Sequence, residues 1–134
     1  MRRAVATVAV LALLVSACGA TETSNQPNFN DQQQQVAEVV DNLADAGRRG
    51  DAERICKEIL AKRLVDELKA AGGDCVTEMD RAIKDASDYD LQVRSIKITG
   101  NSATAQVRQG DDGRTATFTF VKEGGVWKAS ALGT

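Results

Sequence analysis

The spacing of the apolar residues changes once along this chain, near Tyr89, and this change constrains the fold more than any other feature. Before Tyr89, apolar residues recur three and four positions apart, which is the period of an amphipathic helix. After Tyr89, apolar and polar residues alternate, which is the period of a strand with one buried face. Helices followed by strands, in a chain of 134 residues, predict one α+β domain.

Three apolar stripes predict three helices in the first part of the chain. Asp31 is the expected N-cap of the first helix, with Gln34 at capping-box spacing, while Asp51 and Asp74 are the expected N-caps of the other two. Glycines follow the first and second stripes and are expected to end those helices. The stripes are Val36, Val39, Val40 and Leu43, then Ile55, Ile59, Leu60, Leu64 and Leu68, then Val76, Met79, Ile83 and Ala86.

Four stretches of alternating residues predict strands, and short glycine-containing turns separate them. A change of phase after Val93 predicts a β-bulge near Arg94 and Ser95. Such short turns predict an antiparallel meander with one exposed face. The expected fold is therefore α+β, with three N-terminal helices packed on one face of a curved four-stranded sheet. The turns are expected at Gly100–Asn101, Gly110–Gly113 and Gly124–Gly125, and the last strand at Val126–Leu132.

The N-terminal residues have the pattern of a bacterial export signal. Met1–Arg3 carries two positive charges, and Ala4–Ala17 has no charge but is shorter than the ~20 residues that a transmembrane helix needs. The sequence Val15-Ser16-Ala17-Cys18 resembles the lipobox of bacterial lipoproteins, in which an aliphatic residue and two small residues precede a cysteine. That resemblance implies that the thiol of Cys18 takes a diacylglyceryl group, that a signal peptidase cuts before Cys18, and that the new N-terminal amine can be acylated, for example with palmitate. An ordinary secretory peptide with an incidental cysteine is the alternative.

The lipobox resemblance also implies how the chain is divided and where it resides. Residues 1–17 are expected to be a signal peptide, residues 18–31 an acylated Cys18 and flexible tether, and residues 32–134 the folded domain. The protein would then be held by its lipid anchor on the extracytoplasmic face of the cell membrane. Acylation of Cys18 would leave Cys56 and Cys75 as an even pair in an oxidising compartment, so a structural disulfide between them is expected, with a redox-active pair as the alternative.

Several short motifs make the chain from about Val36 to Leu132 resemble a known superfamily. Gly50-Asp51 separates the first two helices, a second cysteine follows a glycine pair in Gly72-Gly73-Asp74-Cys75, and the stretch from Phe120 to Lys128 reads FVKEGGVWK. Together they resemble the NTF2-like (cystatin-like cone) superfamily, and in particular small secreted lipoproteins of actinobacteria. The resemblance implies a cone-shaped fold in which the space between sheet and helices is often a ligand pocket.

Several classes of chemistry lack the residues that they require. The chain contains no histidine, which excludes the Ser-His-Asp and Cys-His mechanisms and histidine-ligated metals. Asp85, Asp88 and Asp90 lack the glycine and the glutamate of a calcium loop, and Asp111-Asp112 is ordinary turn sequence between glycines. Neither a metal nor another cofactor is expected. A net charge of −2 without a basic run argues against binding to nucleic acid.

Four aromatic residues define the candidate ligand pocket. The resemblance to cone folds implies a pocket between sheet and helices, and the aromatic residues predicted near it are Tyr89, Phe118, Phe120 and Trp127. The alternative is that these rings simply fill the core, since a small domain must bury its large apolar side chains.

These observations predict a non-catalytic binding module that takes a small apolar ligand or an envelope partner protein. The alternative is an isomerase or dehydratase of the cone-fold type that uses a helix carboxylate, for which Asp41, Asp45 and Asp66 are the candidates. A purely structural accessory protein is the third possibility. Whether the cone is hollow or filled would separate these functions.

Overall fold

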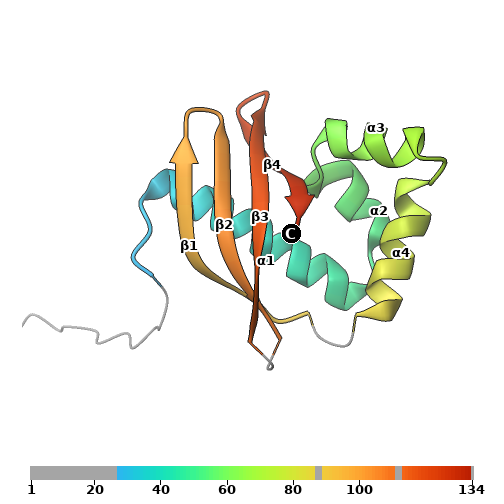
Figure 1. Cartoon of the computed structure of the whole chain (residues 1–134), viewed down its shortest axis with the longest axis horizontal. Coiled ribbons are helices and arrows are strands. Elements are labelled where there is room, and N and C mark those ends of the chain that lie inside the picture. The colour runs from blue at the N-terminus through green and yellow to red at the C-terminus, as the bar shows by residue number, and fades with distance from the viewer. Residues whose placement is uncertain (1–26, 87–88, 111–112, 134) are drawn as a thin grey trace, which may run out of the picture.

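The computed structural model describes residues 27–86, 89–110 and 113–133. The expected signal peptide, Cys18, most of the expected tether, Asp88 and the Asp111-Asp112 pair lie outside the described residues. Helical segments come first and four strands follow (Figure 1). Their bounds are α1 Asp31–Arg49, α2 Ala52–Arg54, the π-helical segment η1 Ile55–Ile59, α3 Lys62–Ala70, α4 Cys75–Asp85, β1 Leu91–Thr99, β2 Ser102–Gln109, β3 Arg114–Glu123 and β4 Val126–Leu132.

The four strands form one antiparallel sheet in the order β1-β2-β3-β4, which confirms the predicted meander and the α+β class. The register between β1 and β2 shifts between Val93 and Ser95, so the predicted bulge is present. A second shift, between Thr119 and Phe120 where β3 pairs with β4, had no counterpart in the sequence analysis. Both bulges add to the curvature of the sheet.

Helix α1 crosses one face of the sheet, whereas α2, α3 and α4 lie beside the edge formed by β4 (Figure 1). The expectation that three helices would pack on the sheet face is therefore wrong, because α1 alone crosses it. The core lies between α1 and the sheet, where alternate strand residues meet the apolar side of the helix. Its most deeply buried members include Val36, Val40, Ala105, Val107 and Phe120.

The second predicted helix is broken into separate segments, which corrects the expectation of one helix from residue 52 to the glycines at 72–73. The Leu60 N–H donates to the carbonyl of Ile55 and closes a π-type turn, after which Leu60 and Ala61 are extended. The Ala61 N–H then donates to Ala129 O of β4 at 2.7 Å, and Leu60 and Ala129 form a parallel bridge. Pairing with the sheet edge outweighs the helical pattern here, and it covers backbone groups that β4 would otherwise expose.

The helix caps follow the predictions at two positions and differ at one. Asp51 accepts a hydrogen bond from the Arg54 N–H and Asp74 accepts one from the Thr77 N–H, as expected. Helix α1 begins one residue earlier than predicted, because Asn30 is its N-cap and forms a reciprocal capping box with Gln33. The helix ends at Gly50, whose φ of 68° favours glycine.

Candidate functional site

A hollow of about 230 Å³ lies between the C-terminal half of α1, helix α4 and the adjoining end of the sheet. We call it the apolar hollow, because aliphatic and aromatic side chains make up most of its wall. The Gln109 amide and the Tyr89 hydroxyl belong to the few polar side chains on this wall. Its lining residues are Leu43, Ala44, Gly47, Met79, Ala82, Ile83, Ala86, Tyr89, Leu91, Gln109, Phe118 and Leu132.

Tyr89 is placed in the apolar hollow by close packing against α1. A Cβ atom added to Gly47 would lie 2.6 Å from Cδ1 of the Tyr89 ring, so the ring occupies the space that any other residue at position 47 would fill. The Tyr89 carbonyl also accepts a hydrogen bond of 3.5 Å from Nη1 of Arg48. Gly47 therefore permits the contact that brings Tyr89 to the hollow.

The structure separates the four aromatic residues of the predicted pocket. Tyr89 and Phe118 both line the apolar hollow. Phe120 is only 1% exposed and lies in the core cluster. Trp127 is buried and lines a different hollow, which α1, η1 and the start of β4 enclose. The sequence analysis expected all four rings near one pocket between sheet and helices, but alternation alone does not show how far along the sheet each strand residue lies.

Trp127 has an environment of its own. The Lys122 ammonium lies 5.6 Å from the centre of the indole ring, within the range of a cation–π contact. Its Nε1 is buried without a hydrogen-bond partner among the described residues. The hollow that Trp127 lines is about 380 Å³ in volume, and Glu38 and Glu58 are its ionisable side chains.

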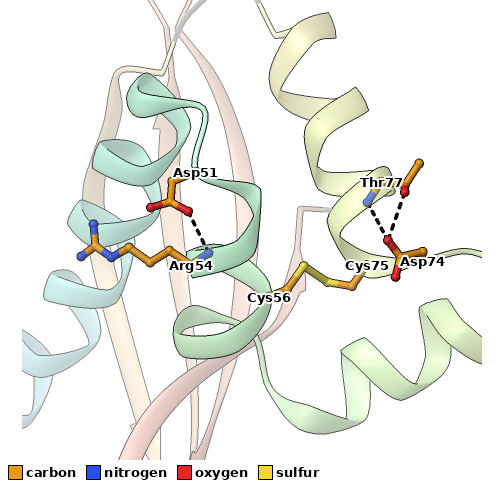
Figure 2. Close-up of a disulfide and its surroundings, with 6 residues drawn as sticks. All are labelled: Asp51, Arg54, Cys56, Asp74, Cys75 and Thr77. Atoms are coloured by element: carbon orange, nitrogen blue, oxygen red, sulfur yellow. Dashed lines mark hydrogen bonds between the residues drawn. A yellow bond between two sulfur atoms is a disulfide. The ribbon is translucent and has the colours of Figure 1, made fainter.

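Cys56 and Cys75 are in disulfide geometry, as the sequence analysis predicted, with a Cα–Cα distance of 6.1 Å. Figure 2 shows the bond joining η1 to the first residue of α4, beside the capped starts of α2 and α4. Because α4 supplies one wall of the apolar hollow, this cross-link fixes the start of that wall relative to η1.

A second hollow, of about 570 Å³, adjoins the first and was not predicted. We call it the charged groove. It runs between α1 and the edge strand β1, and it shares Ala44 and Leu91 with the apolar hollow. The helical spacing of the α1 residues in it was a signal that the sequence analysis did not use. Its lining residues are Pro27, Phe29, Ala37, Asp41, Ala44, Arg48, Asp90, Leu91, Gln92, Val93, Arg94 and Arg108.

The three carboxylates considered for catalysis lie in different environments. Asp41 lines the charged groove, where burial and then the charge of Glu38 raise its pKa while Arg48 partly opposes the shift. Desolvation would raise the pKa of Asp45, but hydrogen bonds and charge from Arg54 and Arg49 outweigh this and lower it. Asp66 lies on the exposed side of α3 in an ion pair with Lys62.

The described residues contain no cluster of three or more His, Cys, Asp or Glu side chains suited to holding a metal ion. Within the same part of the chain, no helix is both long and apolar enough to cross a bilayer. No family model, curated protein or solved structure matches the chain. The two adjoining hollows, one mostly apolar and one lined by charged residues, are recesses between α1 and the described part of the sheet.

Proposed function

We propose that this protein is an extracytoplasmic lipoprotein, anchored to the membrane through Cys18, whose NTF2-like domain is a non-catalytic binding module. The lipobox-like sequence before Cys18 supports the anchor and the localisation. An α1 helix crossing a curved antiparallel meander, with a space left at one end, supports the cone-type fold.

The binding function is carried by one observation, which is the apolar hollow. A recess whose wall is mostly aliphatic and aromatic gains free energy when an apolar ligand displaces its water, at about 25 cal/mol for each Å² of apolar surface buried. The Tyr89 hydroxyl and the Gln109 amide can orient a ligand through hydrogen bonds. The ligand would be a small, largely apolar molecule.

The test uses N-phenyl-1-naphthylamine, a neutral apolar dye that becomes fluorescent when it leaves water. We expect saturable binding to the folded domain and a higher melting temperature in the presence of the dye. Ala82→Leu should abolish this binding, because the larger side chain fills part of the hollow. Ala70→Leu is the matched control, since Ala70 is an exposed alanine at the end of α3 and does not line the hollow.

Equal dye binding by wild type and Ala82→Leu would overturn the assignment of the site to the apolar hollow. The absence of any saturable binding would overturn the ligand-binding function itself and favour the other predicted role, recognition of an envelope protein. Circular dichroism of each variant confirms that a loss of binding is not a loss of folding.

The anchor has an independent test. Mass spectrometry of protein purified from the membrane fraction should find the mature N-terminus at Cys18 with acyl chains attached. Two chains, at about 0.8 kcal/mol for each buried CH₂ group, give stable attachment. A soluble protein with a different, unacylated N-terminus would contradict the proposal.

Asp41 supports a second candidate function, the isomerase or dehydratase alternative. It is the one member of the three proposed carboxylates that combines a raised pKa with a place in the wall of a groove. A carboxyl group with a raised pKa in the wall of a groove is a candidate for proton transfer to or from a bound molecule. Turnover of an enolisable or β-hydroxy compound that Asp41→Asn abolishes, while dye binding persists, would establish the enzyme in place of the binding module.

A further inference from the structure

The apolar hollow and the charged groove adjoin each other, and we call the two together the recess. Ala44 of α1 and Leu91 of β1 belong to the walls of both. The apolar hollow alone, at about 230 Å³, is smaller than the ~300–1,000 Å³ of ordinary ligand pockets, whereas the two together fall within that range. A ligand that fills the recess therefore meets apolar side chains at one end and charged side chains at the other.

The arginines of the charged groove differ from most of the other described arginines. Eight arginines lie in the described part of the chain, and the four that pair with carboxylates are Arg49, Arg54, Arg63 and Arg81. Arg48, Arg94 and Arg108 all line the groove. Among the described residues, no carboxylate oxygen lies within 4.0 Å of their nitrogens. Their guanidinium groups are thus available to an anion.

Two of these arginines are held by their surroundings. Arg48 donates to the carbonyl of Tyr89, which also lines the apolar hollow, so Arg48 lies where the two parts meet. The guanidinium of Arg108 packs over Gly113, since a Cβ added there would lie 3.1 Å from Nη2. Positioned donors lose less entropy when they bind a ligand.

Two carboxylates also line the groove, and they reduce its positive charge without cancelling it. Asp90 accepts a hydrogen bond from the Gln92 amide within the groove wall. Asp41, the other carboxylate, has a pKa that is raised by desolvation and by the charge of Glu38, and lowered in part by Arg48. Three arginines and two aspartates line the groove, so its positive charges outnumber its negative ones and it favours an anion over a cation.

Building on the binding function proposed above, we propose that the ligand is a single-chain amphiphile with an oxyanion head. Its hydrocarbon chain fills the apolar hollow, and its head binds Arg94 and Arg108 in the charged groove. A guanidinium group offers two parallel N–H donors, which match the two oxygens of a carboxylate or phosphate. Arg48, between the two parts, is the third donor.

The experiment compares ten-carbon ligands that differ only in the head, by their ability to displace N-phenyl-1-naphthylamine. Decanoate and decyl phosphate should displace the dye at concentrations about tenfold below those of decanol, and decylammonium should be the weakest. Of decanoate and decyl phosphate, the one that displaces the dye at the lower concentration carries the preferred head group. Added salt should reduce the advantage of the anions, because the groove is open to solvent and its charges are screened.

Arg94→Gln and Arg108→Gln provide the residue-level test. Each substitution should raise the concentration of decanoate needed to displace the dye by roughly three- to tenfold, because it removes one charge-assisted contact at a partly exposed site. The concentration of decanol needed should not change. Arg63→Gln is the matched control, because Arg63 is an exposed arginine on α3 outside the recess. Melting temperatures establish that all three variants fold.

The outcomes separate this inference from the function on which it rests. If decanol displaces the dye as well as decanoate, the anionic head is wrong while apolar binding stands. If decanoate is preferred but Arg94→Gln and Arg108→Gln behave like Arg63→Gln, the head does not bind in the groove and the inference fails. If the dye itself does not bind, the failure is that of the proposed function.

Discussion

Replacing Gly47 with alanine tests the contact that holds Tyr89 at the apolar hollow. Gly47 lies in the last turns of α1 with helical backbone, so alanine is compatible with its conformation. At a solvent-exposed helix position, the change from glycine to alanine would stabilise the protein by up to ~1 kcal/mol, because alanine is the better helix former. Here the new methyl group would lie 2.6 Å from Cδ1 of Tyr89, which is well inside van der Waals contact.

The expected magnitude follows from these two opposing effects. Forcing an extra methyl group into a filled space costs about 1–3 kcal/mol, so the net effect of Gly47→Ala should be a loss of ~0–2 kcal/mol. The ring of Tyr89 can relieve the clash only by moving, and its movement changes the wall of the hollow. We therefore also expect weaker binding of N-phenyl-1-naphthylamine.

A double-mutant cycle with Tyr89→Ala measures the contact itself. Without the ring, Gly47→Ala should become stabilising, so the sign of its effect reverses and the coupling energy is about 1–3 kcal/mol. Urea unfolding followed by circular dichroism gives the four free energies of unfolding. Stabilisation of the wild-type background by Gly47→Ala, or additive effects in the cycle, would refute the packing of Tyr89 on Gly47.

Three further predictions follow from single features of the fold. Replacing both Cys56 and Cys75 with serine should lower the free energy of unfolding by about 3 kcal/mol, because the bond closes a loop with a sequence separation of 19. Equal urea midpoints for the variant and the oxidised wild type would contradict this. Asn30→Ala should cost ~1 kcal/mol in the same assay, since it removes the capping box of α1, and a change below a few tenths would argue against that cap. Because the pKa of Asp41 is raised, the folded state binds a proton at this carboxyl group more tightly than the unfolded chain does. The free energy of unfolding should therefore fall as pH rises from about 4 through the raised pKa, and Asp41→Asn should remove this fall. An identical pH profile for Asp41→Asn and the wild type would contradict the raised pKa.

The sequence predicted the parts of the fold that depend on local patterns. Alternation gave the four strands, and the change of phase at Val93 gave the bulge, because a strand must keep its apolar side chains on one face. The break at Leu60 and Ala61 was missed, because its cause is a hydrogen bond to Ala129, nearly seventy residues later. A helical stripe carries no signal for such a distant partner.

The candidate site was predicted only in part, for a similar reason. Alternation indicates which strand residues face the helix, but it does not show whether α1 covers them. Phe118 and Phe120 have the same phase and are both buried in the core cluster, yet only Phe118 also borders the apolar hollow. The charged groove depends on α1 passing beside β1, so residues far apart in the sequence form it together.

The space between α1 and the sheet is filled at one end of the helix and open at the other. Val36 and Val40, in its first turns, are completely buried against the sheet, whereas Leu43, one turn later, is only half-buried and borders the apolar hollow. Helix α4, which supplies the opposite wall, lies beside the β4 edge (Figure 1) and is linked to η1 through Cys75. The filled end can therefore supply stability while the open end remains free for a ligand. The Cys56–Cys75 bond therefore ties α4, whose residues line the open end, to η1 beside the filled core.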